Sequence, residues 1–312
     1  MHWPQRLAVM LGMLAAGPGW ASGGEYLVFY EPAQQAWVTW EPRTQQYRLH
    51  APEKTQLPAT PIAVYQASRV HLMGRPPSWL RPTTTIPIHL YTEVDGQGGE
   101  DIVVRPYGHS VGQTLTVGGK KNRYPSWSPS GEKIAFQSDR GGYYAIYTMD
   151  KKGEQLAKLS QAGAADNTRP AWSPDGNRIA FQTNRDGNWE IYSLASQGGQ
   201  PLNLTRSPAA DGKPIWAPDG RHLAFVSRRQ GRLGLYIMGA QGQNQRSVSD
   251  QLAGPGDWPP AWSPSGQHLA FSLDRKLYIW GVDDDQLVTL PLGIISGGEP
   301  RFYWWSGDLP AD

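Results

Sequence analysis

The sequence predicts an all-β protein built from repeated four-stranded antiparallel sheets, and three observations support this fold class. A Trp-x-Pro-x-Gly segment recurs four times, beginning at Trp127, Trp172, Trp216 and Trp262. The steps between successive copies are 172−127 = 45, 216−172 = 44 and 262−216 = 46 residues. A repeat of this length with a Trp and a tight turn is typical of the four-stranded sheets, or blades, of a β-propeller. No segment after residue 21 shows the apolar periodicity of a helix.

Each copy predicts four strands in the same order. The Pro and Gly of the repeated segment predict a turn after the first strand, because Pro fixes φ and Gly accepts a positive φ. A second strand carries an Ala-Phe pair and a third an Ile-Tyr or Leu-Tyr pair, and an outer strand such as Gln200–Leu204 completes the unit. The Ala-Phe pairs begin at Ala135, Ala180, Ala224 and Ala270, and the Tyr residues are Tyr147, Tyr192, Tyr236 and Tyr278.

Weaker copies flank the four clear ones. Trp79 stands 127−79 = 48 residues before the first clear copy, and Phe302 stands 302−262 = 40 residues after the last Trp. Three strand-like segments precede them, at Tyr26–Tyr30, Ala36–Trp40 and Tyr47–His50. We expect the C-terminal strand to join these three, because that closure leaves no open sheet edge. The prediction is a six-bladed propeller; in a seven-bladed alternative, residues 51–75 form a reduced blade.

The N-terminal segment predicts export. The apolar run Leu7 to Ala16 is too short to span a bilayer, and the small residues Gly19 and Ala21 precede a favourable cleavage point. A buried N-terminal helix is the alternative. The expected organisation is a signal peptide at 1–21 and a single propeller domain at 22–312, in a periplasmic or secreted protein. The expected blades are 25–50 with 300–305, then 76–120, 121–165, 166–210, 211–255 and 256–298.

Composition restricts the partners. With 29 basic and 27 acidic residues and a formal net charge of +2, the chain has no electrostatic footprint for nucleic acid. No stretch after the export segment reaches membrane-spanning length, so we expect no membrane insertion. The chain has no Cys, so neither disulfides nor thiol chemistry contribute. We expect a monomer without a cofactor.

The repeat resembles that of the TolB propeller family, most strongly over residues 120–282. The matching segments are Pro170–Gly176 (PAWSPDG), Arg178–Phe181 (RIAF), Asn184–Tyr192 (NRDGNWEIY) and Leu202–Thr205 (LNLT). The resemblance implies a six-bladed, exported platform for protein contacts. The sequence offers no counterpart of the α/β domain that precedes the propeller in TolB. Similar propellers also precede the catalytic domains of prolyl-oligopeptidase-type peptidases.

Two other patterns in the sequence have structural explanations. Residues Gly108 to Gly112 match the Gly-x-Ser-x-Gly motif, but a nucleophile elbow needs a helix after it, and Gln113–Val117 predicts a strand. We therefore expect a turn and no catalytic residue. An Arg also recurs 140−127 = 13 residues after each blade Trp. These four residues either form an anion-binding ring or, as we expect, brace each hairpin against the neighbouring blade. They are Arg140, Arg185, Arg229 and Arg275.

The candidate site lies in the loops that enter the innermost strands, which vary from blade to blade and should gather at one mouth of a central channel. The expected partner-binding residues are Arg123, Asp166, Asn167, Asp211, Lys213, Asp257, Trp258 and Glu299. Converging carboxylates suit a cation or a basic peptide; alternatively each side chain caps its own turn. The predicted function is an exported, non-catalytic scaffold that binds an envelope protein or peptide. A propeller hydrolase or lyase with a metal in its channel is the alternative.

Overall fold

The computed structural model describes most of the chain between residues 88 and 290, together with strands near both ends. The described residues are 25–31, 36–41, 46–50, 88–95, 98–106, 111–161, 163–229, 231, 233–248, 260–273, 276–290 and 302–306. They form 23 β-strands in six sheets, and no helix occurs among them. The predicted signal peptide lies outside the described residues. Within them, no helix is long and apolar enough to cross a membrane.

Four consecutive sheets each contain four antiparallel strands in sequence order. The first has β7 (Asn122–Trp127), β8 (Lys133–Ser138), β9 (Ala145–Asp150) and β10 (Ala157–Lys158). The second has β11 (Asn167–Trp172), β12 (Arg178–Thr183), β13 (Glu190–Ala195) and β14 (Leu202–Asn203). The third has β15 (Asp211–Trp216), β16 (His222–Ser227), β17 (Gly234–Gly239) and β18 (Arg246–Ser247). The fourth has β19 (Ala261–Trp262), β20 (His268–Leu273), β21 (Lys276–Gly281) and β22 (Leu287–Leu290).

The remaining two sheets come from the ends of the repeat region. One joins the last strand to the first three, in the order β23–β1–β2–β3, with Val28 opposite Tyr303. Its strands are β23 (Phe302–Ser306), β1 (Glu25–Glu31), β2 (Ala36–Glu41) and β3 (Gln46–His50). The other sheet has three described strands, β4 (Ile88–Val94), β5 (Glu100–Pro106) and β6 (Gln113–Thr114). The strand expected near Trp79 lies outside the described residues.

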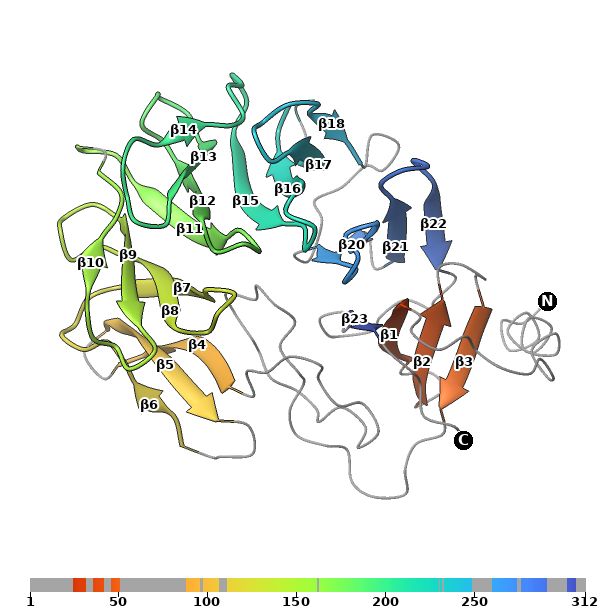
Figure 1. Cartoon of the computed structure of the whole chain (residues 1–312), viewed down its shortest axis with the longest axis horizontal. Helices are drawn as coiled ribbons and strands as arrows, with labels where there is room; N and C mark the ends of the chain where they lie inside the picture. The colour runs from red at the N-terminus through yellow and green to blue at the C-terminus, as the bar shows by residue number, and fades with distance from the viewer. Residues whose placement is uncertain are drawn as a thin grey trace.

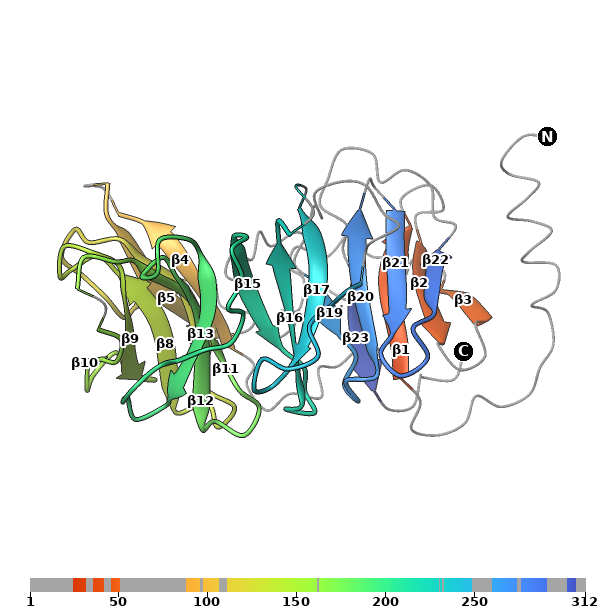
Figure 2. The same cartoon turned by 90° about the horizontal axis from the view of Figure 1, so that it is seen from above.

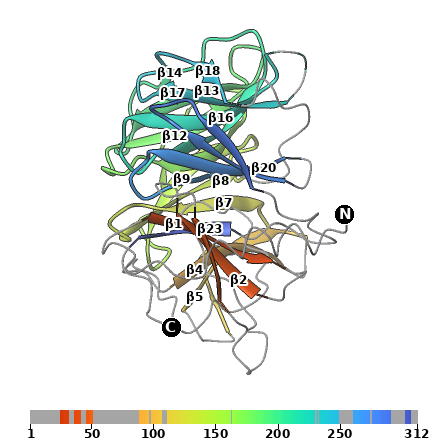
Figure 3. The ribbon, with the colours of Figure 1, turned by 90° about the vertical axis from the view of Figure 1, so that its right-hand side faces the viewer.

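The six sheets follow one another around a common centre (Figure 1). Seen from above, the strands cross the thickness of the molecule, so their connections lie on two faces (Figure 2). The side view shows β23 beside β1 (Figure 3). The all-β, four-stranded antiparallel architecture is therefore confirmed. Closure of the ring stays a prediction, because residues 51–87 between β3 and β4 lie outside the described part of the chain.

The core lies between neighbouring sheets, as expected for blades that cannot bury both faces alone. Ile134 and Phe136 of β8 pack with Ile102 of the preceding sheet, while Ala135 on the other face packs with Phe181 of the following one. The repeated Trp also links the sheets. Trp172 donates through Nε1 to the carbonyl of Ser126, 3.2 Å away in the preceding sheet.

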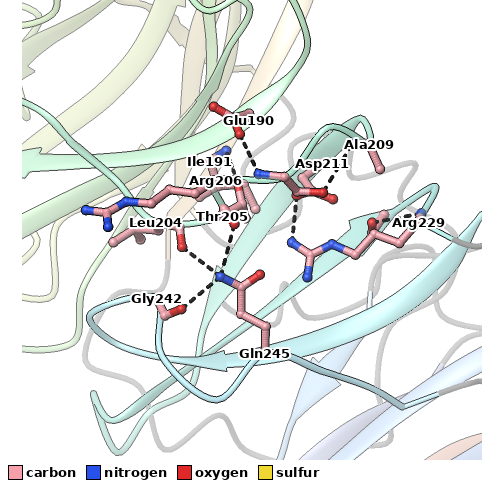
Figure 4. Close-up of polar contacts among 12 residues, drawn as sticks. Glu190, Ile191, Leu204, Thr205, Arg206, Ala209, Asp211, Arg229, Gly242 and Gln245 are labelled. Carbon is pink, nitrogen blue, oxygen red and sulfur yellow. Dashed lines mark hydrogen bonds and ion pairs between the residues drawn. The ribbon is translucent and has the colours of Figure 1, made fainter.

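A turn in the third sheet shows how neighbouring sheets are clamped (Figure 4). Gln245 donates through Nε2 to the carbonyl oxygens of Leu204 at 2.9 Å, Thr205 at 3.2 Å and Gly242 at 2.8 Å. Gly242 has φ +85°, and a Cβ there would overlap the Leu204 carbonyl. The close approach of the two sheets therefore requires Gly at this position.

Candidate functional site on the mouth face

The loops that enter the first strands share one face with the hairpins that join second and third strands. We call this the mouth face. Its described loop residues include 94–95, 98–100, 115–121, 139–144, 161, 163–166 and 184–189. They are connected directly: Glu100 N donates to Lys120 O at 2.9 Å, and Lys121 N donates to Asp139 Oδ1 at 3.0 Å. These contacts place the two sets of loops on one side of the sheets.

Arg123 lies at the start of β7 and pairs with Glu100 through both oxygens of its carboxylate. The hydrogen bonds with Glu100 raise the pKa of Arg123, because they stabilise the charged guanidinium. Burial raises the pKa of the neighbouring Tyr144 hydroxyl, against a smaller opposing effect of Arg123. Arg123 is thus held on the mouth face by the carboxylate of Glu100.

Asp166 and Asn167 hold the entry to β11. Asp166 Oδ1 accepts a hydrogen bond from Tyr144 N at 3.0 Å, and Asp166 N donates to Asn184 Oδ1 at 2.9 Å. Asn167 is buried and donates to the carbonyl oxygens of Tyr144 and Ala165, both at 3.4 Å. Both side chains therefore contact the β8–β9 hairpin of the preceding sheet, and only Asn167 also makes a contact within its own turn, the alternative to partner binding.

Asp211, at the start of β15, is also buried, with 1% of its surface exposed. Its Oδ2 accepts from Arg229 Nη2 at 2.9 Å (Figure 4). Its Oδ1 has no hydrogen-bond partner among the described residues. The carboxylate is therefore buried against Arg229 of its own sheet and is not exposed on the mouth face. Asp257, Trp258 and Glu299, the other expected site residues, lie outside the described residues.

The repeated Arg residues perform the same structural task in three sheets. Arg140, Arg185 and Arg229 each donate to the side chain that begins the first strand of the same sheet. Each guanidinium also lies over the aromatic rings of that sheet, 4.9 Å from the Tyr147 centroid for Arg140. The bracing therefore acts within one sheet, and the expectation of a brace to the neighbouring blade was wrong for these three. Arg275 lies outside the described residues.

Two basic residues, Arg169 and Lys213, lie further along the innermost strands β11 and β15, beyond the strand ends at the mouth face. Lys213 as a whole residue is exposed. Partial desolvation of its ammonium group nevertheless lowers the pKa of Lys213, and the positive charge of Arg169 lowers it further. Arg169 lies 4.1 Å from the ring centroid of Tyr124 and donates through Nη2 to its hydroxyl at 3.0 Å. Sequence analysis singled out Lys213 but missed Tyr124 and Arg169. The signal was available, since all three precede their blade Trp by three residues.

Exposed apolar side chains also gather on the mouth face. Val94 is 69% exposed, Val117 79% and Tyr143 51%. They come from the β4–β5 hairpin, the loop into β7 and the β8–β9 hairpin, which the loop contacts join. Val111 and Leu156, also exposed, lie in connections on the opposite face.

The described residues include no group of three His, Cys, Asp or Glu side chains that could hold a metal ion. The Gly-x-Ser-x-Gly segment connects β5 to β6, so a strand follows it, as the sequence predicted. Ser110 itself lies outside the described residues.

Repeated four-stranded sheets around a common centre define a propeller-type repeat protein. Residues 164–277 match the family model described as "TolB beta propeller domain". This match agrees with the resemblance to the TolB propeller family that the repeats of the sequence show. No curated protein compared with the chain matches it.

Solved structures share this fold at low identity. TolB from Acinetobacter baumannii is 19% identical, with a TM-score of 0.56 over 95% of this chain and 69% of that one. The putative TolB from Agrobacterium tumefaciens is 18% identical, with a TM-score of 0.51 over 86% of this chain and 89% of that one. An oligogalacturonate lyase in complex with manganese is 14% identical, with a TM-score of 0.53 over 87% and 74%. At these identities the likeness shows the fold alone.

Proposed function

We propose that this chain is an exported, non-catalytic, six-bladed propeller that binds a protein or peptide of the cell envelope across its mouth face. The observation that carries the proposal is the gathering of Val94, Val117 and Tyr143, exposed on three connected loops of that face. Exposed apolar side chains that gather on one face mark interaction sites more often than scattered ones do.

The polar surroundings of these side chains fit the same role. Tyr and Arg are enriched at protein interfaces, where their flat side chains combine apolar area with hydrogen bonding. Tyr143 and Tyr144 are adjacent on one hairpin, and the charge of Arg123 acts on the Tyr144 hydroxyl. Because Glu100 already pairs with Arg123, this part of the face is ordered before a partner arrives.

Six blades closed by the shared sheet are part of the proposal. The pairing of β23 with β1 supports it, because it ties the two ends of the described chain into one sheet. The proposal includes a monomeric state, which the same pairing supports because it leaves no open edge at β1. It also includes an envelope location, which the export segment predicted at 1–21 supports.

The test is capture of partners from envelope extract by the full chain carrying a tag. A Val117→Ser/Tyr143→Ser variant alters the mouth face, and a Val111→Ser/Leu156→Ser variant alters the opposite face by matched changes. We expect the wild-type chain and the opposite-face variant to retain the same partner and the mouth variant to lose it. A partner retained equally by all three proteins would contradict the proposal, provided that all three have the same melting temperature.

A metal-dependent propeller hydrolase or lyase is the second candidate. The observation in its favour is the fold shared with an oligogalacturonate lyase, in a chain whose innermost strands carry Arg169 and Lys213. Incubation of the pure protein with Mn²⁺ and oligogalacturonate tests it, with formation of an unsaturated uronate product as the readout. Turnover that depends on Mn²⁺ would overturn the non-catalytic assignment.

A further inference from the structure

The β8–β9 and β12–β13 hairpins have the same turn but different side chains. Gly142 has φ 97° and Gly187 has φ 96°, and each donates its N–H to the carbonyl three residues before it, at 2.9 and 3.1 Å. The residue before this glycine is Gly141 in the first hairpin and Asp186 in the second. Both lie 14 residues after the Trp of their sheet (141−127 = 14, 186−172 = 14), so the two sheets can be compared position by position.

In the sheet β11–β14, Asp186 fills the space beside a tyrosine. Its Oδ2 accepts a hydrogen bond from the Tyr192 hydroxyl and another from Asn203 Nδ2, which is 3.4 Å away. Asn203 lies opposite Tyr192 in the pairing of β13 with β14, and its Nδ2 also donates to Glu190. Two carboxylates of this sheet therefore converge on the amide of its outer strand.

The sheet β7–β10 has the same arrangement, with a cation in place of the amide and no carboxylate at either acidic position. Its residues at the four equivalent positions are Gly141, Ala145, Tyr147 and Lys158. A Cβ added at Gly141 would lie 3.5 Å from Tyr147 Oη and 3.6 Å from Lys158 Nζ. A hydroxyl and an ammonium group thus border the space that corresponds to the Asp186 carboxylate, and Gly141 has no side chain to fill it. We call Gly141, Tyr147 and Lys158 the open cradle.

The charges at the open cradle are positive. Lys158 is exposed, and it makes no ion pair with any residue that the structure describes. Arg140 lies 4.9 Å from the ring centroid of Tyr147, and its side chain donates to one amide and one hydroxyl, both neutral. Asp139, the acidic residue of the same hairpin, accepts a hydrogen bond from the backbone of the loop into β7. A hydroxyl donor beside two cations favours an anion, because its hydrogen bonds there are charge-assisted.

We propose that the open cradle binds a carboxylate, supplied by an Asp or Glu side chain of the partner on the mouth face. The Tyr147 hydroxyl donates to one carboxylate oxygen, as Tyr192 does to Asp186, and Lys158 supplies the opposite charge. The cradle belongs to the same hairpin as the exposed Tyr143, so the partner places an acidic side chain beside its apolar contact. The inference rests on the proposed function for the source of the carboxylate.

The first test uses a probe with a single side-chain carboxylate, N-acetylglutamate N-methylamide, and the glutamine analogue as its neutral match. Both are titrated into the full chain labelled with ¹⁵N at glycine. We expect the glutamate probe to shift the amide resonances of Gly141 and Gly142 with a Kd on the order of 10 mM, and the glutamine probe to shift neither. Gly187 is the internal control, because Asp186 already fills its hairpin. Equal shifts with both probes, or equal shifts at Gly142 and Gly187, would overturn the proposal.

A second test supplies the carboxylate from the chain itself. Gly141 has no positive φ, and an added Cβ would meet Tyr147 and Lys158 only at van der Waals distance, so a side chain fits there. Gly141→Asp should melt about 2 °C higher than the neutral match Gly141→Asn at low salt, and the difference should shrink as salt increases. A lower melting temperature for Gly141→Asp would show that the cradle does not favour a carboxylate.

Lysine variants locate the charge that the probe recognises. Lys158→Gln should weaken binding of the glutamate probe by about tenfold, because it removes the ammonium group. Lys152→Gln changes an exposed lysine of the β9–β10 connection on the opposite face and should leave binding unchanged. Equal affinities of the two variants would overturn the proposal.

Failure here is distinguishable from failure of the proposed function. If Lys158→Gln still captures the envelope partner that the Val117→Ser/Tyr143→Ser variant loses, the partner binds the mouth face without using the open cradle. That result would overturn the inference and leave the proposed function intact. It would do so even if the probe binds, because the carboxylate would then come from a free small molecule.

Discussion

Single residues show how one repeated position can be filled in different ways. The first residue of the innermost strand is Asn122, Asn167 or Asp211, and each accepts a hydrogen bond from the repeated Arg of its sheet. Asn167 also satisfies two backbone carbonyls, whereas Asp211 leaves Oδ1 without a partner among the described residues. A buried oxygen without a donor costs free energy that an amide would recover.

Replacement of Asp211 by Asn should therefore raise the free energy of unfolding by about 1 kcal/mol. The reverse change, Asn167→Asp, should lower it by about 2 kcal/mol, because it removes a donor from two buried carbonyls. Urea denaturation of both variants measures the difference. A lower stability of Asp211→Asn than of Asn167→Asp would show that the Arg229 ion pair outweighs the missing hydrogen bond.

Tyr192 carries the second prediction at this scale. Burial, together with the hydrogen bond that its hydroxyl donates to Asp186, raises its pKa to about 12. The fold thus favours the neutral phenol. Its contribution to stability should be fully present below pH 10, about the ordinary pKa, and should be lost as the pH rises toward 12.

The difference in ultraviolet absorbance between the wild type and Tyr192→Phe isolates this titration. We expect its midpoint near pH 12. Asp186→Asn should lower the midpoint only in part, because burial is the larger cause. A midpoint near pH 10, the ordinary value, would contradict the buried, hydrogen-bonded phenol.

At the scale of strands and turns, stability depends on close contact between neighbouring sheets as well as on the local sequence. Gly242 and Gly187 both have positive φ, but only Gly242 faces a neighbouring sheet closely enough for an added Cβ to overlap it. Gly242→Ala should therefore lower the free energy of unfolding by about 3 kcal/mol, through backbone strain and overlap together. Gly187→Ala should cost about 1 kcal/mol, from strain alone. If denaturant unfolding gave the same decrease in the free energy of unfolding for both variants, the two sheets would separate easily at Gly242.

The sequence predicted the strands well because each is specified locally. The Ala-Phe and Tyr residues fell in the buried second and third strands, and the Pro and Gly of the repeat fell in turns. The β-bulges of the first strands, at Tyr124, Arg169 and Lys213, were not predictable in this way. They depend on glutamine amides of the neighbouring sheet, and a local pattern contains no information about those contacts.

At the scale of the whole molecule, the last strand ties the two ends of the described chain together. β23 pairs with β1 over five residue pairs, so removal of residues 300–312 would expose the edge of β1. An unpaired edge is a template for association with another chain. The shortened chain should melt at a lower temperature and associate in a concentration-dependent manner in analytical ultracentrifugation. A monomer with an unchanged melting temperature would show that the pairing contributes little.

The whole molecule also has two faces with different chemistry, and binding through the mouth face is the central claim. The most direct measurement places a photo-crosslinking amino acid at Tyr143 on that face, or at Leu156 on the opposite face, in the full chain produced in living cells. Both positions are exposed and apolar, so they are matched in all but location. We predict a discrete cross-linked partner from position 143 and none from position 156. A cross-link from position 156 alone would contradict the account.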